Sequence, residues 1–577
     1  MITVTRLRLT CCILLALTLQ VVEAAELRIA VDPSNDALRD NIRAHLGDPG
    51  ERSTASLRRF AGHAREKSKK AMRALGYYQG RVTTRVLDRD PPVLEVAVTP
   101  GDPVRLRRIR IEVRGEAAEM DRFQLPDKLR PETGDIVDHG VYARVKRFFR
   151  NRAQTHGFFN GGFEKQRLAV DPEAGYADIE LVYDSGVRYS LGRAHFTEDI
   201  YFDHSLLQRF VRFEPGSPYH SDRIIELNRD LRDSGYFSEV RVDADPGTAR
   251  DATIPVTVEL NERTRHSIGA GLGFSTDVGP RLRTTWDQHY LNRWGHGQGG
   301  ELELARPRQN LGYYYELPLN PPMSESLRFT GSYQVEDIED TRSERISTGA
   351  QWRSKLDSGW QQVVSLRGEN DRFRVGDETE RTILVLPGIS YSFLSRDSPV
   401  DPSSGYRLQF EVSGSQRNML SDVDILHATV GAKGLTSLGG TRHRLLSRIR
   451  VGAVGTNEFE DVPPSLRFFA GGDQSVRGYE YRTLSPTDDN GDQAGGRFLI
   501  EASAEYQYSL FQSWRVAAFV DRGNAFDDLE ESIDSLKTGA GLGFRWISPV
   551  GPLRLDIARA LDSPRNFRLH FSMGPEL

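Results

Sequence analysis

The strongest constraint on this chain is a strict alternation of apolar and polar residues through its second half. From about His266 onward no helical period remains, and short runs change character at every residue. From Leu327 to Val335, every second residue is apolar or glycine, and Phe567 to Met573 repeats the pattern. A strand with this period of two has one apolar face and one polar face. About sixteen such runs, at roughly 20 residues each with their loops, fill the region to residue 577.

The apolar faces of so many strands need a partner. Hydrophobic residues make up 38% of the chain, which is too few for a polytopic helical membrane protein, because each span takes about 20 mostly apolar residues. The same value suits a membrane β-barrel, whose strands are half apolar. A net charge of −5 gives no support to a nucleic-acid binder. We therefore expect an all-β barrel of about sixteen antiparallel strands, with a soluble all-β fold as the alternative.

The N-terminal residues have the pattern of an export signal. Arg6 and Arg8 precede an uncharged run from Leu9 to Val22, and a small residue follows at Ala24. This order is typical of a secretory signal peptide, which we expect at 1–24, with an uncleaved anchor as the alternative. Its removal would also remove both cysteines, Cys11 and Cys12.

The first half of the chain contains a repeat. In each copy an amphipathic helix ends at a glycine followed by two aromatic residues, and alternating strands follow. The spacing between copies is 81 and then 78 residues, so we expect three copies of one α+β domain, each ordered strand, helix, helix, strand, strand. The glycine suits the left-handed position after a helix, and we expect the aromatics to begin the next strand. The expected domains are 25–101, 102–186, 187–264 and, for the barrel, 265–577, and the glycine-aromatic triplets are Gly76-Tyr77-Tyr78, Gly157-Phe158-Phe159 and Gly235-Tyr236-Phe237.

Several motifs in the second half carry a family resemblance. They are Arg467–Gly472, Ser475–Tyr479, Phe519–Gly523, Gly541–Phe544, Pro549–Asp556 and the terminal Gly574–Leu577. These motifs resemble the BamA/TamA superfamily of outer-membrane assembly factors, and the repeats resemble the POTRA domains of that superfamily. Three such repeats with a sixteen-strand barrel resemble its TamA-like branch, since BamA-like members typically have five and two-partner secretion transporters have two.

The resemblance implies a loop folded into the barrel lumen at about 457–497, with Arg477 meeting acids on the wall. Alternation places Glu505 on the polar, inward face of its strand, and places Phe519 and Asp521 inward on the next strand. We expect Arg477 to pair with both acids through charge-assisted hydrogen bonds. The loop motif is Val476, Arg477, Gly478 and Tyr479.

One hexapeptide, Gly-Ala-Gly-Leu-Gly-Phe, occurs at both 269–274 and 539–544. Its glycines share one strand face and permit a close backbone approach. For the second copy we expect room for the inward loop. For the first copy we expect a weak lateral seam against the last strand, with the same need for space as the alternative. The seam residues are Gly269, Gly271, Gly273, Phe567, Leu569 and Phe571.

The sequence lacks the common signatures of enzymes and of metal sites. It has no Gly-x-Ser-x-Gly elbow, His-Glu-x-x-His pair or Walker loop, and the acidic run from Asp488 to Asp492 fails the spacing of a calcium loop. We therefore expect a non-enzyme with no catalytic residue, metal or cofactor.

The resemblance also implies a localisation and a function. It implies the outer membrane of a Gram-negative bacterium, with the POTRA domains in the periplasm. The implied partners are a TamB-type protein anchored in the inner membrane, nascent outer-membrane β-barrels and outer-membrane lipid. The leading hypothesis is insertion and folding of outer-membrane proteins such as autotransporters through the weak seam. Phospholipid delivery with the same partner and a dedicated secretion pore are the alternatives, and three repeats argue against the pore.

Overall fold

The fold is taken from a computed structural model, which describes residues 25–197, 199–440, 442–530, 534–548, 551–562 and 567–574. The signal peptide expected at 1–24, with its two cysteines, lies outside the described residues. The end of the terminal motif, Pro575 to Leu577, lies outside them as well.

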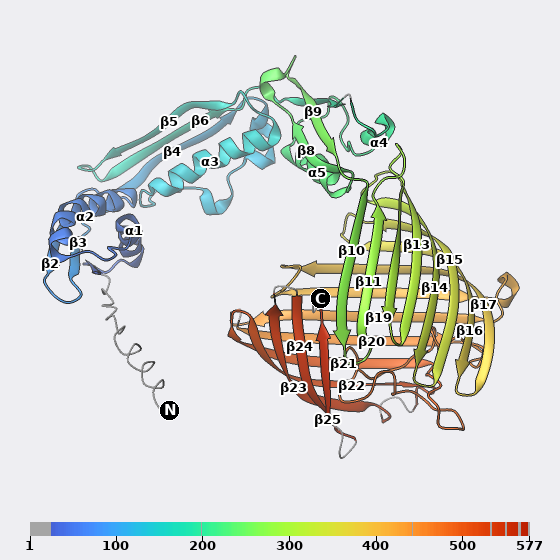
Figure 1. Cartoon of the computed structure of the whole chain (residues 1–577). Coiled ribbons are helices and arrows are strands. Elements are labelled where there is room, and N and C mark those ends of the chain that lie inside the picture. Colours follow the sequence, from blue (N-terminus) through green and yellow to red (C-terminus); the bar gives the residue numbers. More distant parts are fainter. Residues whose placement is uncertain are drawn as a thin grey trace, which may run out of the picture. The chain divides into compact units, whose positions relative to one another are not determined.

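Three small α+β units occupy the first half of the described chain (Figure 1). Each contains a three-stranded sheet with the last strand in the middle, in the orders β1-β3-β2, β4-β6-β5 and β7-β9-β8. This common topology confirms the repeat. The first unit is β1 (Glu26–Val31), α1 (Asp36–Leu46), α2 (Thr54–Ala74), β2 (Arg81–Leu87) and β3 (Val93–Thr99). The second is β4 (Arg105–Arg114), α3 (His139–His156), β5 (Gly162–Asp171) and β6 (Tyr176–Asp184), and the third is β7 (Ser190–Phe196), α4 (His204–Gln208), α5 (Ser221–Asp233), β8 (Phe237–Asp243) and β9 (Thr253–Glu262).

The second unit departs from the expected order, because three short 3₁₀ turns between residues 116 and 129 stand where its first helix was expected. Its long helix α3 begins at the cap Asp138, whose carboxylate accepts hydrogen bonds from the backbone of Gly140 and Val141. Phe149 on the buried face of α3 stacks on Tyr183 of β6, with ring centroids 5.8 Å apart. Among the described residues, no helix is long and apolar enough to cross a membrane.

The first two glycine-aromatic triplets lie in the turns that follow a helix and not at the start of a strand. Gly76, Gly157 and Gly235 all have positive φ, as expected after a helix. Only the third triplet begins a strand, at Phe237, so the expectation that the aromatics open the strands is wrong for the first two. The tyrosine hydroxyl of Tyr78 instead lies 2.6 Å from His139 Nε2 in the next unit. The aromatic side chain of the first triplet therefore contributes to the contact between the first and second repeats.

The second half forms a single antiparallel sheet of sixteen strands that curls into a nearly closed barrel (Figure 1). Each strand pairs with its neighbour in the sequence, which confirms the expected fold class. Outward residues such as Ile449 and Leu542 are half or more exposed, whereas Asp521 on an inward face is fully buried. The strands are β10 (His266–Ser275), β11 (Gly279–Gln288), β12 (Gly297–Ala305), β13 (Arg308–Pro318), β14 (Glu325–Ile338), β15 (Thr341–Lys355), β16 (Gln361–Val375), β17 (Glu378–Arg396), β18 (Gly405–Ser415), β19 (Ile425–Leu438), β20 (His443–Gly455), β21 (Phe498–Phe511), β22 (Trp514–Phe526), β23 (Lys537–Ser548), β24 (Gly551–Ala560) and β25 (Phe567–Met573).

The long connection from β20 to β21, residues 456–497, folds into the lumen. Its apolar side chains Phe468, Val476 and Leu484 are buried in one cluster with wall residues such as Leu386 of β17 and Leu499 of β21. Burial of these side chains removes apolar surface from the water-accessible lumen and holds the connection against the wall. We call this segment the lumen loop.

A buried histidine makes the second unit sensitive to acid. His156, at the end of α3, is 1% exposed, and neither ring nitrogen has a hydrogen-bond partner among the described residues. Burial lowers the pKa of His156 to about 4, with further lowering by His220, whose ring centroid lies 4.8 Å away, and by Arg122, Arg188 and Arg152. The folded unit therefore holds His156 neutral where the unfolded chain, with an ordinary pKa near 6.5, binds a proton.

Because the folded pKa of His156 is depressed, stability is present above pH 6.5 and is lost as the pH falls toward 4. We expect the local free energy of unfolding to fall by about 2 kcal/mol between pH 7 and pH 5. Hydrogen exchange of amides in 139–193 measures this change. His156→Leu should remove most of it, whereas His63→Gln, at an exposed position on α2, should not. An unchanged pH dependence in His156→Leu would contradict the assignment.

Candidate functional site: the lumen loop and the barrel seam

Arg477 of the lumen loop lies inside the barrel with its side chain almost fully buried. Its Nε and Nη2 donate to the two carboxylate oxygens of Asp521, at 2.7 and 2.9 Å, and Nη1 donates to Glu505 at 2.7 Å. The guanidinium also stacks on Phe519, with Cζ 3.4 Å from the ring centroid. The structure thus brings Arg477 together with the three wall residues that sequence analysis assigned to it.

The cluster is larger than sequence analysis expected. Asp556 of β24 accepts from Arg477 Nη1 at 3.1 Å and from Arg545 of β23 at 2.5 Å, and Arg545 also binds Glu505. Two guanidiniums therefore share three carboxylates, rather than one arginine between two acids. The missed Arg545 had a signal: it follows Gly539, Gly541 and Gly543 at the same period of two, and so shares their inward face.

The other residues of the loop motif also contact the wall. Val476 is fully buried. The Gly478 backbone N–H donates to Nε2 of His570 on β25 at 3.0 Å, and its φ of +100° favours glycine. The Tyr479 hydroxyl donates to Asp562 at 2.9 Å. The motif therefore fastens the loop to the last strands of the barrel.

The second Gly-Ala-Gly-Leu-Gly-Phe copy, on β23, makes room for this cluster. A Cβ at Gly539 would collide with the backbone oxygen of Arg477. A Cβ at Gly541 would lie 2.5 Å from Phe519 Cζ and would overlap the backbone oxygen of Ile557. Because glycine has no Cβ, these positions leave the space that the sequence predicted for the inward loop.

The first and last strands, β10 and β25, meet at a short seam. Within the described ranges, two hydrogen bonds join β25 to Thr276, the residue that follows β10, from Thr276 N to Phe571 O at 3.0 Å and from Phe571 N to Thr276 Oγ1 at 3.2 Å. The rings of Phe274 and Phe571 lie 5.8 Å apart, centroid to centroid. By contrast, β10 pairs with β11 along its whole length. The seam is therefore the weakest junction in the described wall.

The seam residues are offset from the expected arrangement. Gly269, Gly271 and Gly273 lie on β10, and Phe567, Leu569 and Phe571 lie on β25, as expected from their strands. However, Phe571 meets Thr276, five residues beyond Gly271, which is roughly 16 Å along a strand. Gly271 has open space on its inward face. Continuing this antiparallel register places Gly271 opposite residue 576, which lies outside the described residues, so the expected pairing at Gly271 stays a prediction.

The lumen loop contacts both sides of the seam. On the β10 side, Asp473 N donates to Asp277 Oδ2 in the β10–β11 turn at 2.6 Å. On the β25 side, His570 accepts from Gly478, and Arg568 Nη2 donates to Glu480 at 2.6 Å. These three bonds exceed the two that join the strands directly. The lumen loop thus links the β10–β11 turn to β25 across the seam.

Beside the seam, most of one edge of β10 has no strand partner among the described residues. In the part of the chain that the structure describes, no group of three or more His, Cys, Asp or Glu side chains could hold a metal ion. Backbone N–H and C=O groups along a strand edge of this kind can pair with a further strand.

Three family models match parts of the chain. Residues 324–576 match the Omp85 superfamily domain, and residues 28–100 match POTRA domain 1 of TamA. Residues 189–263 match the POTRA model described as a surface antigen variable number repeat.

Two curated relatives carry the description outer membrane protein assembly factor BamA. The protein from Nitratidesulfovibrio vulgaris is 26% identical over 400 residues, which cover 64% of this chain and 49% of that protein. The protein from Neisseria meningitidis serogroup B is 22% identical over 568 residues, which cover 84% and 69%. The chain thus spans about half the length of the first relative and somewhat over two thirds of the second.

A solved structure shares the fold. BamA from Haemophilus ducreyi lacking POTRA domains 1–3 superposes with a TM-score of 0.67 at 14% identity, over 82% of this chain and 99% of that one. At this identity the likeness concerns the fold.

Proposed function

Since this chain carries an Omp85 superfamily barrel domain preceded by POTRA domains, we propose that it inserts and folds β-barrel proteins in the outer membrane. The single observation that carries the proposal is the seam, where, among the described residues, β25 is joined to the end of β10 only by two hydrogen bonds to Thr276. A client strand entering lipid must satisfy every backbone group, and an open strand edge supplies the missing partners. The descriptions of the two curated relatives support the same task.

A finer assignment is part of the proposal. We place the protein in the TamA-like branch, in the outer membrane with its POTRA domains in the periplasm. The match of 28–100 to POTRA domain 1 of TamA and the presence of three POTRA-like units support this branch. Its proposed partner is a TamB-type protein anchored in the inner membrane, and its proposed clients include autotransporters.

A photo-crosslinking amino acid at Gly271 tests the function in growing cells. We expect it to capture the terminal strand of nascent outer-membrane barrels. Gly431 is the matched control, because it is an inward glycine with open space on a strand, β19, that pairs on both sides. Equal capture at both positions, or capture at neither, would remove the insertase proposal. Capture of lipid at Gly271 without client protein would favour phospholipid delivery with the same partner.

A disulfide across the seam tests whether opening is required. Two hydrogen bonds hold the Thr276 and Phe571 backbones beside each other, and a disulfide can join residues whose Cα atoms are roughly 4.4–6.8 Å apart. We therefore expect Thr276→Cys with Phe571→Cys to crosslink on oxidation and to lower client insertion at least tenfold. A reductant should restore insertion, and each single cysteine variant should insert normally under both conditions. Insertion at the wild-type rate by the oxidised double variant would show that this seam does not open.

A further inference from the structure

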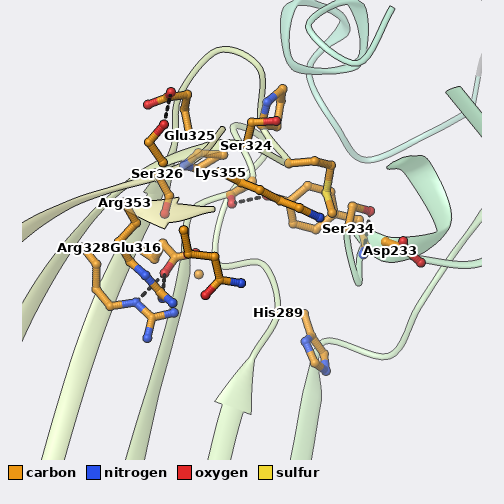
Figure 2. Close-up of a pocket in the computed structure, with 18 of the residues that line it drawn as sticks. Asp233, Ser234, His289, Glu316, Ser324, Glu325, Ser326, Arg328, Arg353 and Lys355 are labelled. Atoms are coloured by element: carbon orange, nitrogen blue, oxygen red, sulfur yellow. Dashed lines mark hydrogen bonds and ion pairs between the residues drawn. The ribbon is translucent and has the colours of Figure 1, made fainter. Parts of the chain in front are cut away.

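A polar cavity of about 370 Å³ lies where β13 and β15 end and β14 and β16 begin, beside the end of α5 (Figure 2). Trp352 on β15 is exposed toward the outside of the barrel, so Arg353 and Lys355 are on the lumen side. The volume is within the range of small-molecule sites, roughly 300–1,000 Å³. The cavity is remote in sequence from the lumen loop and the seam, which contribute none of its lining residues.

Two guanidiniums compete for one carboxylate in this cavity. Arg328 hydrogen-bonds Glu316 and stacks over Tyr314, with its Cζ 4.3 Å from the ring centroid. Arg353 reaches the same carboxylate only as an ion pair, with Nη1 3.7 Å from Oε2, and makes no hydrogen bond to a described residue. Figure 2 shows both arginines directed at Glu316. The donors of Arg353 are therefore available.

Lys355 is a second available cation. Its ammonium has neither an ion pair nor a hydrogen-bond acceptor among the residues described, and in Figure 2 the side chain extends toward Ser234. The carboxylate of Glu325, another lining residue, accepts from Trp352 Nε1 and Ser354 Oγ and is not ion-paired with Lys355. A lining atom, Nε2 of His289, is also buried without a partner. The buried, unpartnered nitrogen of His289 favours a polar ligand, and the exposed Lys355 can reach a ligand that enters from solvent.

The remaining acid lies on a different side of the cavity. Asp233, at the end of α5, lines the cavity and lies away from Arg353 in Figure 2. It forms no ion pair with any described residue. The cavity therefore offers the Arg353 guanidinium on the β15 side, the Asp233 carboxylate at the end of α5, and the Lys355 ammonium, which extends from β15 toward that end. A ligand with a negative end and a positive end matches this arrangement.

We propose that this cavity binds a phosphate-type oxyanion that carries an amino group. Arg353 and Lys355 hold the phosphate, because a planar guanidinium and a compact ammonium are both strong phosphate donors. Asp233 holds the ammonium. The ligand is a soluble phosphoester or a phospholipid headgroup of this chemistry, and the site is independent of whether the seam opens.

Titration calorimetry on the full-length protein in detergent micelles tests the proposal. The probes are inorganic phosphate, phosphoethanolamine and a short-chain phosphatidylethanolamine. We expect phosphoethanolamine to bind more tightly than inorganic phosphate. Arg353→Gln and Lys355→Gln should each raise its Kd at least tenfold. Asp233→Asn should raise the Kd for phosphoethanolamine and leave that for inorganic phosphate unchanged.

A matched control lies on the same strand. Arg342→Gln, at the opposite end of β15, removes an arginine that already has Asp337 and Glu344 as partners, and should leave all three affinities unchanged. Melting temperatures verify that each variant remains folded. Tighter binding of the lipid than of phosphoethanolamine identifies a lipid source, and equal binding identifies a soluble one. Absence of binding by the unmodified protein, or an equal loss in Arg342→Gln, overturns the proposal.

Discussion

Arg477→Ala is expected to release the lumen loop and to destabilise the barrel by about 3–5 kcal/mol, the usual cost of removing one partner from a buried ion pair. Arg545 would still pair with Glu505 and Asp556, but the buried Asp521 would lose its guanidinium partner. Of the two acids that the sequence pairs with Arg477, only Asp521 would therefore lack a counter-charge. Chemical unfolding in micelles measures the loss of stability, and protease cleavage within 456–497 measures the release of the loop.

Arg477→Lys tests whether charge alone is enough. An ammonium keeps the charge but cannot donate at once to both oxygens of Asp521 and to Glu505 from a planar fork. We expect it to recover only part of the lost stability. Arg568→Lys, at a partly exposed arginine bound to Glu480, is the control and should change stability by less than about 1 kcal/mol. Normal stability and an intact loop in both Arg477 variants would contradict the role given to this cluster.

Gly541→Ala is the second change with a large expected effect. The new methyl group would overlap Phe519 and the Ile557 backbone, which cannot rotate away. Overpacking of this kind typically costs about 1–3 kcal/mol, and here it would also displace the ring on which Arg477 stacks. We expect a lower unfolding midpoint and faster cleavage of the lumen loop.

The chain contains its own control for this change. Gly271 is the middle glycine of the other Gly-Ala-Gly-Leu-Gly-Phe copy, and a Cβ added there would have the Arg283 backbone oxygen, at 4.0 Å, as its nearest neighbour. Gly271→Ala should therefore be neutral or stabilising by up to about 1 kcal/mol, through the unfolded state. Equal losses in the two variants would show that the hexapeptide, and not its surroundings, sets the cost.

These two glycines show what local sequence can and cannot determine. Alternation assigns each of them to an inward strand face, because the period of two is a property of the strand itself. It assigns Glu505, Phe519 and Asp521 to the lumen for the same reason. It cannot distinguish Gly271 from Gly541, since their neighbours along the chain are identical. The difference arises from Phe519 and Ile557, which belong to other strands.

The sequence by itself determined the strand period, the repeat near 80 residues and the inward faces that place acids near Arg477. The tertiary structure alone decided that Arg545 and Asp556 complete the cluster, because curling of the sheet brings β21 through β24 around one loop. It also decided the seam. A hairpin turn sets the register of sequence neighbours, but β10 and β25 share no turn. The meeting of Thr276 with Phe571 therefore depends on closure of the whole barrel.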